Sequence, residues 1–162
     1  MNSRRTSSAL LSICTGALAV GAPLLAVPAH ADGADDGALL NGINATRAAN
    51  GCGPVAENPQ LSAAAARQAN DMLANNVQSH TGSDGSSVGQ RISAAGYTTY
   101  SKAGEIIFWS TGVGAVPAAA VDWWMNSPGH RAIITDCGMT EVGVAVVRNG
   151  PRAAAVGEFG SR

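Results

Sequence analysis

The C-terminal end of the chain carries the pattern that most restricts its fold. Val142, Val144 and Val146 alternate with other residues, Asn149-Gly150 follows, and a second apolar run then covers residues 153–159. Alternation is typical of a β-strand, and Asn-Gly is a strong turn signal for a β-hairpin. The connection is too short for a crossover, so the two strands are expected to be antiparallel.

Helical periodicity and capping residues predict that helices precede this hairpin. Asn58-Pro59 and Ser127-Pro128 each have the form of a helix N-cap followed by proline at the first helical position. One of Trp123 and Trp124 is expected to face inward, and the pattern leaves open which one. The expected elements are a loose polar segment at 32–37, helices at 39–49, from 59, at 87–95, at 117–125 and from 128, and strands at 97–100 and 105–109. This order predicts an α+β domain with a mostly antiparallel sheet.

The N-terminus has the form of a removable secretory signal peptide. Arg4 and Arg5 precede an apolar stretch at 9–27, and Ala29-His30-Ala31 supplies a small-residue cleavage site. We therefore expect residues 1–31 to be the signal peptide and residues 32–162 to form one domain, which is secreted and extracellular or associated with the cell envelope. The mature chain has no second apolar run long enough to span a bilayer.

The charge of the chain argues against two classes of partner. The net charge is −1, and no basic block remains after Arg4 and Arg5 are removed. A nucleic-acid partner is therefore not expected, and no basic amphipathic helix is present to hold a membrane surface. We expect a monomer.

Cys52 and Cys137 are the cysteines of the predicted mature chain. In an exported protein an even pair predicts a disulfide, and the alternative is two free thiols. Closing so long a loop contributes at most about 4–5 kcal/mol.

His80 and His130 lie in compact polar motifs, and Glu105 is a lone carboxylate inside an apolar stretch. Two imidazoles and a carboxylate can hold zinc and leave one coordination position open for water or a ligand. Two alternatives stay open from the residues alone. Glu105 could be a buried carboxylate paired with Arg91 or Arg131, and Ser127 is interpreted as a helix cap rather than a nucleophile.

The chain resembles the CAP superfamily (the SCP/TAPS or cysteine-rich secretory protein group), in its bacterial extracellular branch. The order and spacing of several short segments cover nearly all of the predicted mature chain. The segments that carry the resemblance are His80-Thr-Gly-Ser-Asp-Gly-Ser-Ser, Arg91-Ile92, Ala95-Gly96-Tyr97, Ala103-Gly104-Glu105, Trp124-Met-Asn-Ser-Pro-Gly-His-Arg131 and Thr140-Glu-Val-Gly-Val-Ala145.

The resemblance implies an α-β-α sandwich with a surface cleft, in which two histidines and two acids can hold a divalent metal such as zinc. His80, Glu105 and His130 match three of these positions, and the second acid has no clear match. The nearest polar residues are Asn126 and Ser127, which with Arg131 are expected to line the cleft.

This chain also departs from the family's usual pattern at two positions. Ile106 and Ile133 stand where asparagines are usual, so fewer polar groups are expected to orient ligands in the cleft.

The function that follows is a secreted protein whose cleft binds a divalent metal, a small apolar ligand or a cell-envelope component. One alternative is an extracellular, metal-assisted, peptidase-like hydrolase that uses the same cleft. The other is a structural or signalling domain with a vestigial site. The incomplete acid set favours binding over turnover.

Overall fold

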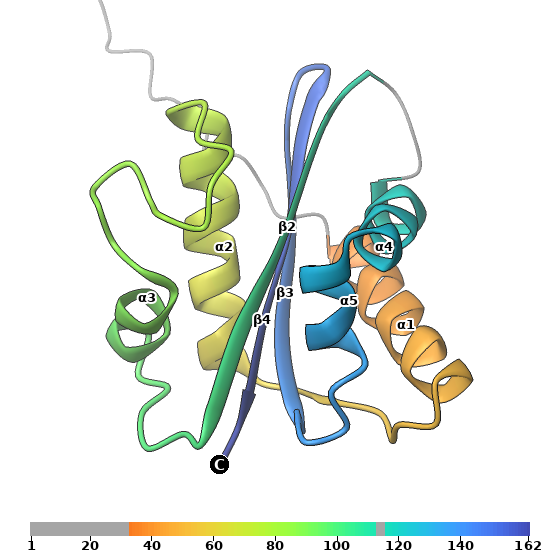
Figure 1. Cartoon of the computed structure of the whole chain (residues 1–162). Coiled ribbons are helices and arrows are strands. Elements are labelled where there is room, and N and C mark those ends of the chain that lie inside the picture. Colours follow the sequence, from red (N-terminus) through yellow and green to blue (C-terminus); the bar gives the residue numbers. More distant parts are fainter. Residues whose placement is uncertain (1–32, 113–115) are drawn as a thin grey trace, which may run out of the picture.

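The computed structural model describes residues 33–112 and 116–162 (Figure 1). The predicted signal peptide therefore lies outside the described residues. The elements, in chain order, are α1 (Gly33–Ala49), β1 (Ala56–Glu57), α2 (Pro59–Ala74), α3 (Val88–Ala94), β2 (Lys102–Thr111), α4 (Val116–Asn126), α5 (Pro128–Ile134), β3 (Glu141–Asn149) and β4 (Arg152–Ser161). None of the helices in these ranges is long and apolar enough to cross a membrane.

A single four-stranded sheet, in the order β1-β3-β4-β2, forms the middle layer. The predicted hairpin is present as β3 and β4, which pair antiparallel around Asn149-Gly150. β2 also pairs antiparallel with β4, whereas β1 is a two-residue parallel addition to β3. The expected mostly antiparallel sheet is confirmed, and the short β1 is too small to leave a pattern in the sequence.

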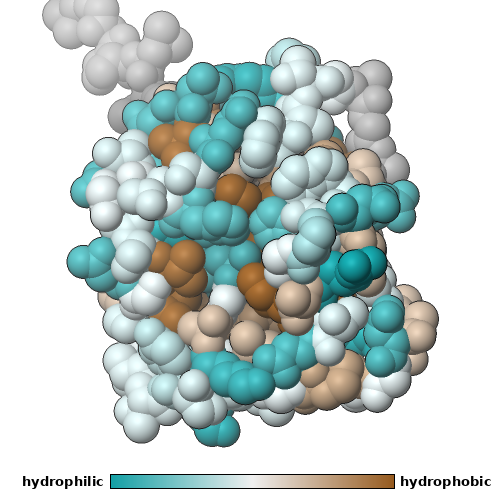
Figure 2. Space-filling view, in the orientation of Figure 1, coloured by the Kyte–Doolittle hydropathy of each residue, from teal (hydrophilic) through white to brown (hydrophobic). Residues whose placement is uncertain are grey.

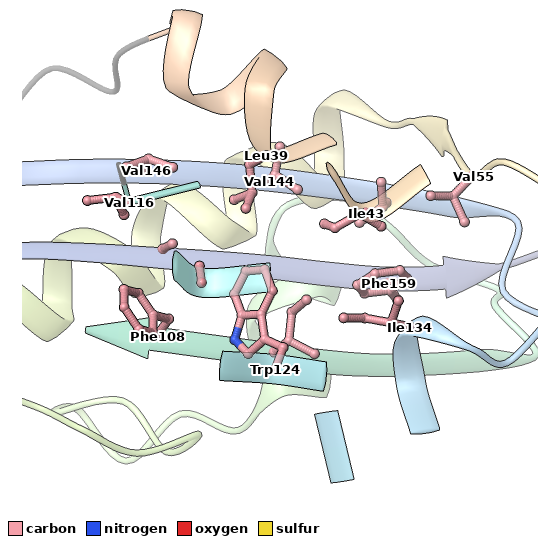
Figure 3. Close-up of a cluster of buried hydrophobic side chains, with 14 of the residues drawn as sticks. Leu39, Ile43, Val55, Phe108, Val116, Trp124, Ile134, Val144, Val146 and Phe159 are labelled. Carbon is pink, nitrogen blue, oxygen red and sulfur yellow. The ribbon is translucent and has the colours of Figure 1, made fainter. Parts of the chain in front are cut away.

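Helices cover both faces of the sheet, as the resemblance implies. In Figure 1 the sheet is seen nearly edge-on, with α2 and α3 on one side and α1, α4 and α5 on the other. Side chains of β3 alternate between the two sides: Val144 joins the core under α1 and α4, whereas Ala145 joins the core under α2. Trp124 is fully buried among Ile43, Phe159 and neighbouring side chains (Figure 3), which answers the question of which tryptophan faces inward.

Close packing of α2 on the sheet depends on Gly143. A Cβ at this position would lie 2.0 Å from the backbone carbon of Leu61. The absent side chain lets α2 approach β3 closely, and the loop that follows α2 carries His80.

Helix α2 begins as the sequence predicts. The Asn58 side chain accepts hydrogen bonds from the backbone N–H groups of Gln60 (2.9 Å) and Leu61 (3.2 Å), and Pro59 occupies the first helical position.

Two local predictions are wrong. Residues 33–37 are helical rather than loose, because Asp36 accepts a hydrogen bond from the backbone N–H of Val146 (2.6 Å) and Asp35 pairs with Arg148 (2.6 Å). Residues 97–100 form a loop rather than a strand, since Thr99 has a positive φ of 59° that interrupts an extended backbone.

The predicted disulfide between Cys52 and Cys137 is present, with a Cα–Cα distance of 4.9 Å and a sequence separation of 85. It joins the segment after α1 to the segment before β3. Arg47, which is 1% exposed, lies close by and donates to four backbone carbonyls on both sides of this junction, those of Gly53, Ile134, Asp136 and Met139.

Candidate functional site

His80 lies in the loop after α2, and two buried side chains fix the backbone there. Gln68 on α2 donates to the carbonyl of Ser79 (2.8 Å), and Arg91 on α3 donates to the carbonyl of His80 (2.9 Å). The imidazole itself is about half exposed. The loop therefore holds an accessible ring on a rigid base.

Glu105 on β2 orients the His80 ring. Its Oε1 lies 2.7 Å from Nδ1 of His80, and because a carboxylate only accepts, Nδ1 donates. The side chain of Glu105 is fully buried. This hydrogen bond leaves Nε2 as the nitrogen of His80 with a free lone pair, the arrangement that carboxylates commonly impose on metal-binding histidines.

Arg91 occupies the other oxygen of Glu105. Its Nη2 lies 2.5 Å from Oε2 of Glu105, and its side chain is 1% exposed. Of the two partners that the sequence left open, the structure selects Arg91 for Glu105, and Arg131 is exposed. Both carboxylate oxygens of Glu105 are thus engaged within the protein.

A second buried acid, Glu158 on β4, is paired directly with Glu105 on the neighbouring strand β2. Glu158 is 0% exposed, and its nearest cation is Arg91, whose Nε lies 3.9 Å from Oε1. Burial raises the pKa of Glu158 well above its ordinary value, and the charge of Glu105 raises it further. Neither oxygen of Glu158 has a hydrogen-bond partner within the described ranges, so this buried carboxyl group is favoured in its neutral, protonated form.

Glu158 was not identified from the sequence, although Glu158 has the same feature that identified Glu105. Both are lone acids in apolar strands. The resemblance directed the search for a second acid to the residues before the Ser-Pro-Gly-His motif. The structure instead supplies a second acid from β4, behind Glu105 rather than in the cleft.

His130 lies in the first turn of α5, as predicted, and is 9% exposed. Its ring centroid lies 5.5 Å from that of His80 and 5.1 Å from that of Trp123. Burial lowers the pKa of His130, and the neighbouring His80 lowers it further, against the opposing charge of Glu105. Its Nδ1 is buried and has no hydrogen-bond partner within the described ranges. The lowered pKa of His130 widens the pH range over which its ring is neutral, and the neutral ring is the form that binds metals.

The residues expected to line the cleft contribute less than the histidines. Asn126 donates to the carbonyl of Asp122 within α4, and Ser127 occupies the N-cap position of α5 without a side-chain cap hydrogen bond. The predicted capping position is thus right, but the capping contact is absent. In the described part of the chain, no hydrogen bond or ion pair joins Asn126, Ser127 or Arg131 to the histidine pair, so their cleft role stays a prediction.

The two isoleucines that replace the usual asparagines serve packing. Ile106 is fully buried in the core on the α1 and α4 side of the sheet. Ile133 covers Gly104, where an added Cβ would lie 3.2 Å from its side chain.

The expected three-ligand metal site meets a physical obstacle in this arrangement. Across residues 33–112 and 116–162, no group of three His, Cys, Asp or Glu side chains is placed to hold a metal ion. The reason is visible at Glu105, whose oxygens face His80 and Arg91. What the structure brings together is a pair of imidazoles, with Glu105 hydrogen-bonded to one of them.

Solved structures of other proteins share this fold at low sequence identity. An outer surface protein from Borrelia burgdorferi superposes with a TM-score of 0.71 at 21% identity, covering 83% of this chain and 98% of that one. An extracellular protein with an SCP domain from Bacillus anthracis gives a TM-score of 0.71 at 23% identity, over 81% of this chain and 41% of that one. NaASP2, solved with Zn²⁺, gives 0.58 at 15% identity, over 80% of each chain.

Sequence comparison identifies the family. No curated protein matches the chain. Residues 40–159, however, match the model of the cysteine-rich secretory protein family. This span contains His80, His130 and the buried glutamates Glu105 and Glu158. The predicted resemblance is thereby confirmed, and the chain belongs to the cysteine-rich secretory protein (CAP) family.

Proposed function

We propose that the protein binds a divalent cation, such as zinc, through the imidazoles of His80 and His130. The observation that carries this proposal is the 2.7 Å contact between Glu105 and Nδ1 of His80. It fixes the tautomer and the direction of the ring, so that Nε2 is left to bind. Glu105 then acts as the orienting group behind His80, rather than as the third ligand that the sequence suggested.

The lowered pKa of His130 supports the same proposal. A protonated imidazole cannot bind a metal, and the lowered pKa of His130 keeps the ring unprotonated over a wider pH range. Two protein ligands leave the remaining coordination positions of the ion to water or to a further ligand. With few polar groups converging on the pair, binding fits this cleft better than hydrolysis.

Calorimetric titration of the purified protein with zinc tests the proposal. We expect saturable binding that disappears in the His80→Ala/His130→Ala double variant. Glu105→Gln should weaken binding by about 10- to 100-fold, because the ring loses its anionic partner. Glu57→Gln, at an exposed position on β1, is the matched control and should bind as the unsubstituted protein does. Zinc binding that persists unchanged in the double-histidine variant would contradict the proposal.

A second candidate function, binding of a small apolar ligand, is favoured by a groove between α1 and α4. Its volume is about 470 Å³, and it is lined by Asp35, Ala38, Gly42, Pro117, Ala118, Val121 and Asp122. This size and largely apolar lining suit a small ligand. The apolar site would thus lie between these helices, apart from the histidine pair.

Displacement of a fluorescent fatty acid tests this second candidate. Ala38→Trp fills the groove and should abolish binding, whereas Ala63→Trp, at an exposed position on α2, should leave it unchanged. Equal binding by both variants would place the apolar ligand elsewhere.

A further inference from the structure

Two tryptophans stand out from the surface beside the histidine pair. Trp109 on β2 is 36% exposed and Trp123 on α4 is 41% exposed, and they are the exposed large hydrophobic residues of the described part of the chain. Adjacent Trp124 is fully buried, with its indole N–H donating to the carbonyl of Ile107 (2.8 Å). Exposing two indoles side by side leaves apolar area in water and is typical of a binding surface.

The exposed tryptophans and the histidine pair form a row of four rings, in the order Trp109, Trp123, His130 and His80. The ring centroids of Trp109 and Trp123 lie 5.9 Å apart, those of Trp123 and His130 lie 5.1 Å apart, and those of His130 and His80 lie 5.5 Å apart. Successive planes are tilted by 61°, 42° and 49°. No ring lies flat on the next, so these contacts are tilted or edge-on rather than stacked. The exposed fractions of Trp109 and Trp123 show that part of each indole is open to solvent.

The buried side of this row is supported. Phe108 packs against Trp123 at a centroid distance of 6.1 Å and is itself 9% exposed. A ring with a buried aromatic neighbour loses little conformational freedom when it binds a ligand, which is what gives rigid aromatic anchors their value in recognition.

A small, partly polar hollow lies at the Trp109 end of the row. Its volume is about 50 Å³, and its lining is mixed. Beside Trp109, the apolar lining residues are Met72, Leu73, Val77 and Ala153, and the polar ones are Asn76, Gln78, Ser110, Thr111 and Arg152. A water molecule occupies about 30 Å³ in the liquid, so the hollow admits a substituent such as a hydroxyl or hydroxymethyl group but not a whole ring. Amide and hydroxyl groups can both donate to and accept from such a substituent.

These features together select one class of ligand. A purely apolar ligand has a better site between α1 and α4, and an acidic ligand would find a single arginine in the hollow. On the face shown in Figure 2, hydrophobic residues are scattered among hydrophilic ones rather than joined into one surface. A sugar ring combines an apolar C–H face, which the negative face of an indole attracts, with hydroxyl groups that the hollow can bind.

We propose that Trp109 and Trp123, with the partly polar hollow beside Trp109, bind a neutral oligosaccharide built from pyranose rings with equatorial substituents. The sugar rings stack on the indoles, a substituent of one ring enters the hollow, and the chain runs toward His130. This binding does not require a metal, so it is independent of the function proposed above.

Titration with chitotetraose, a neutral tetramer of β-1,4-linked N-acetylglucosamine, tests the proposal, with calorimetry and tryptophan fluorescence as readouts. We expect saturable binding with a dissociation constant of about 1 mM or below, unchanged by a chelator. Trp109→Ala and Trp123→Ala should each weaken binding by about tenfold, and Trp109→Phe should restore part of the loss because it retains an aromatic face. Tyr100→Ala, which removes a ring stacked on Tyr97 just before the other end of β2, is the matched control.

Three results would overturn the proposal. The first is an absence of saturation up to about 10 mM tetrasaccharide. The second is unchanged affinity in the Trp109→Ala/Trp123→Ala variant with a native circular dichroism spectrum. The third is binding of sulfated but not neutral oligosaccharides, which would indicate a cationic surface instead of stacking. If the double variant unfolds, the Trp109→Phe and Trp123→Phe variants decide, since both retain an aromatic ring. Each should bind more weakly than the unsubstituted protein, and unchanged affinity in both would overturn the proposal.

Discussion

Two equally buried arginines find their hydrogen-bond partners in different ways. Arg47 lies near the disulfide, and Arg91 lies beside Glu105. Both side chains are 1% exposed. Arg47 donates through all three of its nitrogens to backbone carbonyls, at 2.8–3.0 Å. Arg91 donates to two carbonyls and to Glu105, and its Nε has no hydrogen-bond partner within the described ranges.

The difference separates an arginine whose partners cannot titrate from one that lies among titratable groups. The partners of Arg47 are carbonyls, so its hydrogen bonds do not depend on the protonation of a partner. Arg91 lies between two carboxyl groups, one of which, Glu158, has both oxygens buried without a hydrogen-bond partner in the described part of the chain. Incompletely satisfied, titratable groups lower stability and are concentrated at sites whose chemistry depends on them.

The largest expected effect is the loss of Arg47. In Arg47→Met four carbonyls lose their donor, and those of Ile134 and Met139 are buried. We expect the free energy of unfolding to fall by about 3–5 kcal/mol. Urea denaturation with the disulfide intact measures the change. Arg67→Met, which removes an exposed arginine paired with Asp84, is the control and should cost less than about 1 kcal/mol. Equal losses in the two variants would mean that the carbonyls near the disulfide find other donors.

A smaller loss of stability is expected for Arg91→Met. Glu105 loses its cation but keeps its hydrogen bond with His80, so part of the cost of an unpaired buried charge is offset. We expect a loss of about 2–4 kcal/mol at neutral pH, measured by the same denaturation. Unlike Arg47→Met, this variant should also lose zinc affinity, because the Glu105 and His80 contacts depend on Arg91. If Arg91→Met keeps full zinc affinity, the buried charges do not contribute to metal binding.

The contrast between the arginines also shows what the sequence could and could not reveal. Capping at Asn58, the β3 and β4 hairpin and the disulfide leave short patterns, and these predictions are confirmed. The burial of Arg47 leaves none, since its partners come from residues up to 92 positions away. An arginine in a helix has the same local pattern whether its end reaches solvent or a distant carbonyl.

The candidate site was predictable to a similar extent. His80, His130 and Glu105 stood out by their motifs, and the structure brings them together. Which of them orients another and which is left to bind a ligand was not predictable. These roles depend on which oxygen of Glu105 faces which partner. The register that sets Glu158 beside Glu105, and the choice of Trp123 rather than Trp124 for the surface, likewise arise only when strands and helices pack.

The most specific expected effect is that of Glu158→Gln on the pH dependence of stability. The pKa of Glu158 is raised in the folded protein, so above about pH 4.5, its ordinary value, the folded chain holds a proton that the unfolded chain releases. Unfolding then becomes easier as pH rises, by at most about 1.4 kcal/mol per pH unit, until the pH passes the raised pKa. Below about pH 4.5 both states are protonated and the group contributes no slope. Glu158→Gln removes this ionisation, so its stability should match that of the unsubstituted protein at low pH and exceed it increasingly as the pH rises. Denaturation of both proteins from about pH 4 to 9 measures the difference, from which contributions shared by the two, such as that of His130, cancel. A difference that stays constant across this range would mean that Glu158 ionises in the folded state as readily as in the unfolded chain, and Arg91 would then be as fully paired as Arg47.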